Sequence, residues 1–164
     1  MISLLVAYTK NNRIIGAQGK IPWKLSSERN RFKEICRDKY VIMGRKSYEE
    51  IGKPLSYCTL IIVSRSLSNN MGSLSLSKGL VVCTSLEDAI NYCKSQNQEE
   101  ILIAGGGSIY QQALPYADKI YATEIDADFE GDTFFPELDD SWTCTIDETH
   151  KENGILYKYL TLKK

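Results

Sequence analysis

The sequence predicts an α/β fold: a central, mainly parallel and twisted sheet with flanking helices and an antiparallel hairpin at the C-terminal end. Three observations predict this class. Short apolar runs alternate with helical segments through about Ala113, which is typical of parallel sheets. Strand-like runs dominate after that point. The last two runs are joined by Asn153-Gly154, a dipeptide that favours tight hairpin turns.

The strands are predicted from short runs of Ile, Leu, Val and Tyr. Near-continuous apolar character suits strands that are buried on both faces. These runs cover residues 2–8, 40–44, 59–63, 80–83, 101–104 and 119–125. The hairpin strands cover residues 142–149 and 155–162.

The helices are predicted where apolar residues recur at helical spacing and where glycine or proline ends the pattern. They cover residues 27–36, 45–51, 86–95 and 108–114. Ser26, Ser27 and Ser85 are side chains that commonly cap a helix start. Segments rich in Gly, Ser and Asn are expected to be loops, over residues 9–20 and 66–79.

The bulk composition describes an ordinary globular chain that fits one domain over residues 1–164. The net charge is −1, so we expect neither nucleic acid nor a membrane as a partner. The five cysteines include no Cys-x-x-Cys pair, which favours reduced thiols and a cytoplasmic protein. His150 is the only histidine, so no metal site is expected and His150 is predicted to be a surface strand residue.

Two strand-to-helix junctions suit phosphate groups: residues 44–47, Gly-Arg-Lys-Ser, and residues 105–108, Gly-Gly-Gly-Ser. In parallel sheets, ligands bind at the C-terminal ends of the strands, where backbone N–H groups at helix starts are exposed. Two such junctions suit a dinucleotide. Arg45, Lys46 and Arg65 add positive charge there, which favours NADPH, with its additional phosphate, over NADH.

One further stretch places an acid at the start of a helix. Pro22 and Trp23 precede Glu28, which would lie in the first turn of the helix, where the backbone dipole favours an anion. Taken alone, Glu28 could be an ordinary helix-start acid and Trp23 an ordinary core residue.

These stretches together resemble dihydrofolate reductase, in the family's order and along nearly the whole chain. The matching residues include Ile2-Ser3-Leu4 with Ala7, Ile15-Gly16, Ile21-Pro22-Trp23, Glu28, Val41 to Arg45, Ser64-Arg65, Gly105 to Gly107 with Ile109-Tyr110, Thr123, and Glu130 to Thr133. The resemblance implies NADPH-dependent reduction of 7,8-dihydrofolate to 5,6,7,8-tetrahydrofolate in one-carbon metabolism. Hydride would pass to pterin C6, and Glu28 would assist protonation of N5. The resemblance also implies a monomer.

The resemblance also implies roles for individual residues. Glu28, Trp23 and Thr123 would be catalytic, and the loop from Thr9 to Leu25 would close over the nicotinamide, packed against Gly131-Asp132. The substrate would be bound by Leu5, Val6, Ala7, Glu28, Arg29, Phe32, Ile51, Lys53, Leu55 and Thr123. The cofactor would be bound by Ala7, Ile15, Gly16, Gly44, Arg45, Lys46, Ser47, Val63, Ser64, Arg65, Ala104, Gly105, Gly106, Gly107, Ser108, Ile109 and Tyr110.

Two positions depart from the common bacterial pattern. The acid is Glu28 where bacterial relatives usually carry Asp, and Cys58 stands where the family usually has an Arg that binds the glutamate tail of the substrate. A thiol cannot form a bidentate ion pair with a carboxylate. The tail would then be bound by Lys53, Arg29 or Arg31, or held weakly. We therefore expect a raised KM for dihydrofolate and altered binding of antifolate inhibitors, as in trimethoprim-resistant enzymes.

Two other functions remain open from the sequence. A pyrimidine reductase of riboflavin synthesis would share the architecture and NADPH but act on a ribosyl-phosphate substrate. A nucleotide-binding module without turnover is the other alternative, suggested by the missing Arg.

Overall fold

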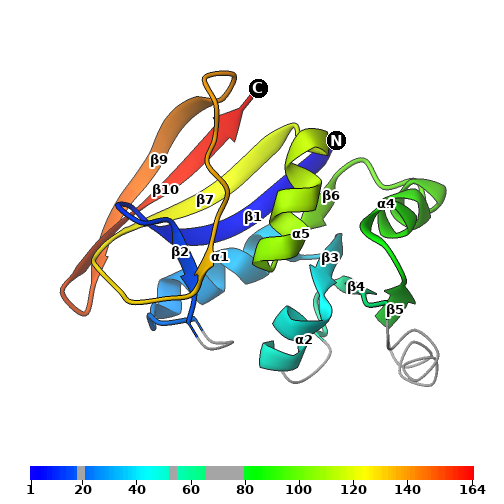
Figure 1. Ribbon diagram of the computed structural model, residues 1–164, viewed down its shortest axis with the longest axis horizontal. Helices are drawn as coiled ribbons and strands as arrows, with labels where there is room; N and C mark the ends of the chain where they lie inside the picture. The colour runs from blue at the N-terminus through cyan, green and yellow to red at the C-terminus, as the bar shows by residue number, and fades with distance from the viewer. Residues whose placement is uncertain (18–20, 52–54, 66–79) are drawn as a thin grey trace.

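The computed structural model describes residues 1–17, 21–51, 55–65 and 80–164. Within them, eight strands form one sheet in the order β5-β4-β3-β6-β1-β7-β10-β9 (Figure 1). Their bounds are β1 Ile2–Thr9, β3 Tyr40–Gly44, β4 Thr59–Val63, β5 Leu80–Cys83, β6 Ile101–Ile103, β7 Lys119–Asp126, β9 Thr143–Glu152 and β10 Ile155–Lys163. The predicted site residue Lys53 and the predicted loop over 66–79 lie outside the described residues.

The strand directions confirm the predicted fold class. β5, β4, β3, β6, β1 and β7 run parallel to one another, whereas β10 is antiparallel to both β7 and β9. Asn153 and Gly154 connect β9 to β10 with positive φ angles of 52° and 78°. This geometry is that of the predicted two-residue hairpin turn. His150 lies on β9 with a half-exposed side chain.

Both faces of the central strands are buried, and successive side chains point to opposite faces of the sheet. Leu4 and Val6 pack with α4 (Leu86–Ser95) and α5 (Gly107–Ala113) on one face of the sheet. Leu5 instead packs on the face covered by α1 (Ser26–Cys36), with Phe32 and Cys36. This double burial explains why the strands read as continuous apolar runs in the sequence.

The start of α1 corrects one prediction. Neither Ser26 nor Ser27 caps the helix with its side chain; instead, Glu152 on β9 accepts hydrogen bonds from the backbone N–H groups of Ser26 (2.8 Å) and Ser27 (3.3 Å). The carboxylate satisfies N–H groups that lack partners within the helix. The end of the hairpin therefore fixes the start of the helix that carries Glu28.

The other helices begin and end near their predicted limits. Ser85 caps α4 as predicted, because its hydroxyl accepts from the backbone N–H of Asp88 at 3.1 Å. The remaining helix, α2, spans Arg45–Ile51 and follows β3 directly. A 3₁₀ turn over Leu114–Tyr116 follows α5, because Pro115 cannot continue a regular helix.

The segment after β1 also differs from the prediction of a loop over residues 9–20. β2 (Ile14–Gly16) pairs in an antiparallel manner with β8 (Thr133–Phe134). Gly131 makes this pairing close, because a Cβ at that position would lie 2.4 Å from Ile14 Cγ2 and 2.6 Å from Gly16 O. The predicted packing of Gly131-Asp132 against this loop is confirmed.

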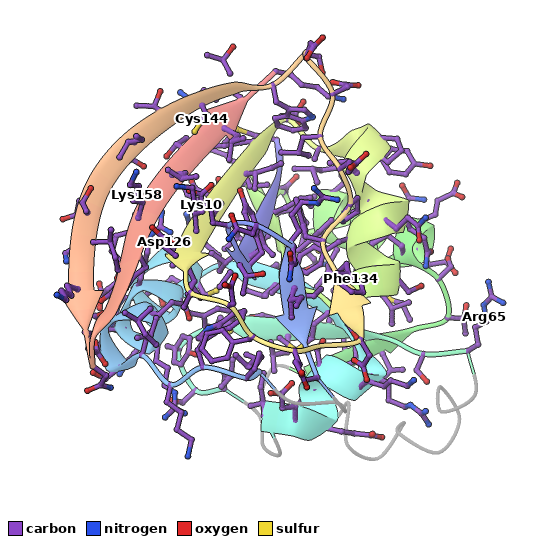
Figure 2. All side chains as sticks on the ribbon, turned by 60° about the vertical axis from the view of Figure 1, so that its left-hand side comes forward. Lys10, Arg65, Asp126, Phe134, Cys144 and Lys158 are labelled. Carbon is purple, nitrogen blue, oxygen red and sulfur yellow. The ribbon has the colours of Figure 1, made fainter. Side chains whose placement is uncertain are left out.

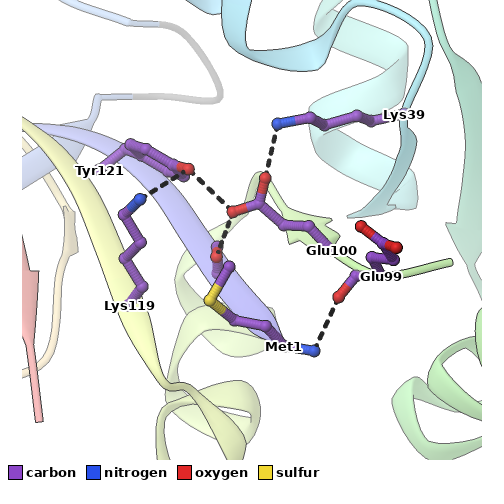
Figure 3. Close-up of polar contacts among 7 residues, drawn as sticks. Met1, Lys39, Glu99, Glu100, Lys119 and Tyr121 are labelled. Carbon is purple, nitrogen blue, oxygen red and sulfur yellow. Dashed lines mark hydrogen bonds and ion pairs between the residues drawn. The ribbon is translucent and has the colours of Figure 1, made fainter.

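A polar network stabilises the end of the sheet at which β1, β3 and β6 begin (Figure 3). Glu100 accepts hydrogen bonds from Lys39 Nζ (2.5 Å), the Ser3 hydroxyl (2.7 Å) and the Tyr121 hydroxyl (2.8 Å). Burial of Glu100, whose side chain is 12% exposed, would by itself raise its pKa. The three hydrogen bonds outweigh burial and lower that pKa below the ordinary value of 4.5.

We expect Glu100→Gln to lower the free energy of unfolding by about 1 to 2 kcal/mol at neutral pH, because the neutral amide removes the ion pair with Lys39 and keeps one acceptor oxygen where the carboxylate has two. A carboxyl group with a lowered pKa stabilises the fold above its unfolded pKa and loses that contribution as pH falls through its folded pKa. The difference between wild type and variant should therefore shrink below about pH 4.5. Urea unfolding at several pH values measures this difference in the free energy of unfolding. Glu99→Gln, which replaces the exposed neighbouring glutamate, is the control. A difference that persists at pH 3, or one equal to that of the control, would contradict this assignment.

Candidate active site

The C-terminal ends of β1, β3 and β6 meet at one edge of the sheet. There, the backbone N–H of Gly44 donates to Gly105 O and that of Ala104 donates to Ile42 O, each at 2.8 Å. These bonds hold the chain after β3 beside the chain after β6. Two cavities, of about 540 and 480 Å³, open at this edge among the described residues. We call them the first and the second cavity.

The first cavity has mostly apolar walls, and two carboxylates, Glu28 and Glu50, belong to its lining. Its walls come from β1, the loop before α1, α1 itself, α2 and the glycines after β6. The lining residues are Leu5, Val6, Ala7, Ile15, Ile21, Trp23, Glu28, Arg29, Phe32, Met43, Ser47, Glu50, Ile51, Leu55, Tyr57, Ala104, Gly105, Gly106 and Tyr110. A planar apolar molecule with one polar edge fits such a lining.

Glu28 lies on α1 and faces β7 across the end of the first cavity. The hydroxyl of Thr123, which is 1% exposed on β7, donates to Glu28 Oε1 at 3.4 Å. Burial raises the pKa of Glu28 above 4.5, and the nearby Arg31, the Thr123 bond and Arg29 offset part of that rise. A partly buried carboxyl group of raised pKa beside an apolar cavity is typical of proton-transfer sites.

Trp23 holds the entrance to α1 in place. Its indole is 6% exposed and packs edge-on against Phe129 at a centroid distance of 5.8 Å. Leu25, Tyr157 and Tyr159 belong to the same apolar cluster, which joins the loop to the hairpin. The ring therefore lines the first cavity and is held in place by these apolar neighbours.

The second cavity lies at the two strand-to-helix junctions and contains three cationic side chains: Arg45, Lys46 and Arg65. Figure 2 shows Arg65 at the periphery, where the chain leaves β4. Glycine is required at the cavity wall, because a Cβ on Gly107 would lie 2.8 Å from Thr133 Cγ2. Cations beside a closely approachable backbone suit a phosphorylated ligand.

The two cavities adjoin, because Ile15, Ser47, Glu50 and Gly106 line both. Ile15 comes from β2, so the pairing of β2 with β8 places it at the junction. Ligands in the two cavities would therefore meet at this junction.

The structure brings most of the predicted site residues to these cavities. Of the described predicted substrate residues, all but Thr123 line the first cavity, and Thr123 contacts Glu28 directly. The predicted cofactor residues line the second cavity, except for four that line the first: Ala7, Ala104, Gly105 and Tyr110. Arg31, one of the three cations predicted for the substrate tail, does not line the first cavity and instead donates to the Thr123 hydroxyl at 3.2 Å. Its binding of the tail stays a prediction.

Five lining residues were not among the predicted site residues: Ile21, Met43, Glu50, Tyr57 and Thr133. Glu50 is the most informative, because its carboxylate accepts from the backbone N–H of Ile21 at 2.8 Å and so ties the loop to α2. Its place one residue before Ile51 was the only sequence signal. Across the described ranges, no cluster of three or more metal-ligating side chains occurs, and no helix is long and apolar enough to cross a membrane.

The sheet topology is that of an α/β enzyme, and the linings of the two adjoining cavities suit a phosphorylated ligand beside a flat apolar one. Comparison with known proteins agrees: residues 1–164 match the family described as dihydrofolate reductase. The chain is 40% identical over 150 residues to the dihydrofolate reductase of Haemophilus influenzae, covering 91% of this chain and 88% of the relative. It is 35% identical over 168 residues to that of Bacillus subtilis, covering 100% and 95%.

A third relative, dihydrofolate reductase type 3 of Salmonella typhimurium, is 36% identical over 168 residues, covering 100% of this chain and 98% of the relative. The chain belongs to the dihydrofolate reductase family. This assignment favours the predicted enzyme over both alternatives, the pyrimidine reductase and the module without turnover.

Proposed function

We propose that this chain reduces 7,8-dihydrofolate to 5,6,7,8-tetrahydrofolate with NADPH, with the substrate in the first cavity and the cofactor mainly in the second. The observation that carries the proposal is the hydrogen bond between the partly buried Glu28 and the buried Thr123, beside a cavity that adjoins a cationic one. Membership in the family supports the same reaction.

The pterin ring would lie against Phe32, Ile51 and Leu55, which line the apolar walls. Its 2-amino group and N3 would donate to the Glu28 carboxylate, since two N–H donors match two carboxylate oxygens. Thr123 holds one of these oxygens and so fixes the plane of the carboxylate.

Glu28 would also supply the proton for N5. Its raised pKa brings protonation closer to working pH than an exposed glutamate allows. A water held by Trp23 would carry the proton, because a carboxylate bound to the 2-amino edge cannot itself reach N5. Closure of the loop that carries Ile15 would exclude bulk water.

NADPH fits the second cavity by charge and shape. The phosphates would bind to the backbone at Gly106 and Gly107, and the additional phosphate would bind Arg45 and Arg65, with Lys46 near. When bound, NADPH would supply the hydride for pterin C6. Ala7 and Tyr110 would flank the nicotinamide, and the Tyr110 hydroxyl is held by its hydrogen bond to Leu5 O at 2.6 Å.

The tail of the substrate would extend toward Tyr57 and Arg29 at the mouth of the first cavity. Cys58 cannot ion-pair with the tail carboxylate, because a thiol carries no positive charge in either protonation state. Burial raises the pKa of this thiol to about 11. Arg29 remains as the described cation in the lining and would bind the tail carboxylate, in place of the Arg common in the family.

Because the tail lacks a bidentate partner at Cys58, we expect Cys58→Arg to lower the KM for dihydrofolate about tenfold, the effect of one charged hydrogen bond. Antifolates with a carboxylate tail should bind more tightly by a similar factor. Steady-state kinetics and inhibitor titration measure both effects, and thermal melting checks folding. Cys144→Arg, at an exposed thiol on β9 (Figure 2), is the control. Unchanged KM and inhibitor affinity in a folded Cys58→Arg protein would show that Cys58 does not limit tail binding.

The reaction itself is tested by following NADPH absorbance with dihydrofolate or with a ribosyl-phosphate pyrimidine as the substrate. We expect oxidation with dihydrofolate alone. Oxidation only with the pyrimidine, or with neither substrate, would overturn the proposed function.

A further inference from the structure

Arg31 lies outside both cavities yet reaches the hydrogen-bond partner of Glu28. It follows Glu28 by three residues on α1, so both side chains lie on the same side of the helix and face β7. Arg31 Nη1 donates to the Thr123 hydroxyl oxygen at 3.2 Å and to Ala122 O at 3.0 Å. The Thr123 hydroxyl donates onward to Glu28 Oε1 at 3.4 Å.

The direction of these bonds follows from the chemistry of the groups. A guanidinium has donors and no acceptor, whereas a hydroxyl has one proton and two lone pairs. Arg31 therefore occupies a lone pair of Thr123 and cannot accept its proton. The hydroxyl proton must point elsewhere, and Glu28 is the acceptor that it reaches.

Packing holds the Arg31 guanidinium in this position. Its Cζ lies 4.2 Å from the centroid of the Tyr159 ring on β10, and Tyr159 pairs directly with Thr123 across the sheet. The imidazole of His150 packs against the same tyrosine at 4.8 Å. Arg31 is thus clamped between the hairpin and the strand that carries Thr123.

The charges around Glu28 make Arg31 its main favourable partner. Among the charged groups, Arg31 offsets the effect of burial on the Glu28 pKa most strongly, followed after the Thr123 bond by Arg29. The titratable and charged groups that face Glu28 or Arg31 are Arg29 on α1, Tyr110 on α5, Tyr121 on β7, Asp147 and Glu148 on β9, and Tyr159 on β10.

We propose that Arg31 is a positioning residue for the reaction, which turns the Thr123 hydroxyl toward Glu28 and keeps a positive charge beside that carboxylate. This inference rests on the proposed role of Glu28 in proton supply. Without Arg31, Glu28 would keep its proton to a higher pH. The Thr123 hydroxyl, which donates to the Glu28 carboxylate, would also lose the side chain that orients it.

Three substitutions separate the two effects of Arg31. Arg31→Met removes donor and charge, Arg31→Gln keeps an N–H donor without charge, and Arg31→Lys keeps the charge. Arg37→Met, at an exposed position at the end of α1, is the matched control. Two readouts are used in the full-length protein: the ¹³C NMR titration of the Glu28 carboxyl, assigned by its loss in Glu28→Gln, and the pH profile of kcat with dihydrofolate and NADPH.

We expect Arg31→Met to raise the titration midpoint of Glu28 by about one pH unit, the size of shift that a neighbouring charge produces. The alkaline fall in kcat should move upward by the same amount. Arg31→Gln should titrate like Arg31→Met, and Arg31→Lys and Arg37→Met should titrate like the wild type.

An Arg31→Met protein that is folded and titrates like the wild type would overturn the inference. If thermal melting shows that Arg31→Met does not fold, equal Glu28 midpoints in Arg31→Gln and Arg31→Lys would overturn it instead. Absence of dihydrofolate turnover in the wild type, with the NMR shift still present, would overturn the proposed function and leave the effect of Arg31 on Glu28 standing.

Discussion

Glu28→Gln should lower kcat for dihydrofolate reduction by about a hundredfold or more at neutral pH, within the range of a lost general acid. An amide cannot take up and release a proton as a carboxyl group does, and it presents one oxygen to a substrate edge that carries donors. The deficit should grow as pH rises, because solution protons then become too scarce to replace those from Glu28. Steady-state kinetics across pH measure this loss.

Glu34→Gln is the control for this substitution, since Glu34 is an exposed acid on the same helix, paired with Arg37. It should keep the wild-type rate and pH profile. A Glu28→Gln protein with a wild-type kcat at high pH would show that the proton reaches the substrate by another route.

Replacing both cavity arginines, Arg45→Ala with Arg65→Ala, should lower the preference for NADPH over NADH by about a hundredfold or more. Each guanidinium would form charge-assisted hydrogen bonds to the additional phosphate, and each such group contributes about tenfold or more in affinity. The loss should appear in KM for NADPH, whereas kinetics with NADH should change little. Measuring kcat/KM for both nucleotides gives the ratio.

Lys94→Ala removes a cation from the last turn of α4, outside both cavities, and serves as the matched control. It should leave the nucleotide preference unchanged. A double variant that still prefers NADPH as strongly as wild type would place the additional phosphate away from Arg45 and Arg65.

The strands and the junctions between strands and helices could be predicted because their causes are local. Leu4, Leu5 and Val6 are apolar in succession since each faces a packed layer, and Asn153-Gly154 adopts its turn through its own backbone preferences. The junction after β6 could be predicted from its glycine-rich composition alone.

Other features depend on residues distant in the chain. Glu152 supplies the cap of α1 across more than a hundred residues, and β2 exists because β8 pairs with it. From its charge, Arg31 was one of three cations predicted to bind the substrate tail. Its contact with Thr123 depends on the packing of α1 against β7, and its contact with Tyr159 on the register of β10 against β7, which no local pattern encodes.

The most direct test of the central claim uses NADPH deuterated at nicotinamide C4, with dihydrofolate as the second substrate and NMR of the isolated product. We predict deuterium at C6 of the tetrahydropterin ring, and no such product from the Glu28→Gln protein over the same short reaction time. Oxidation of NADPH without deuterium at C6, or no oxidation at all by the wild type, would contradict the proposed function of this chain.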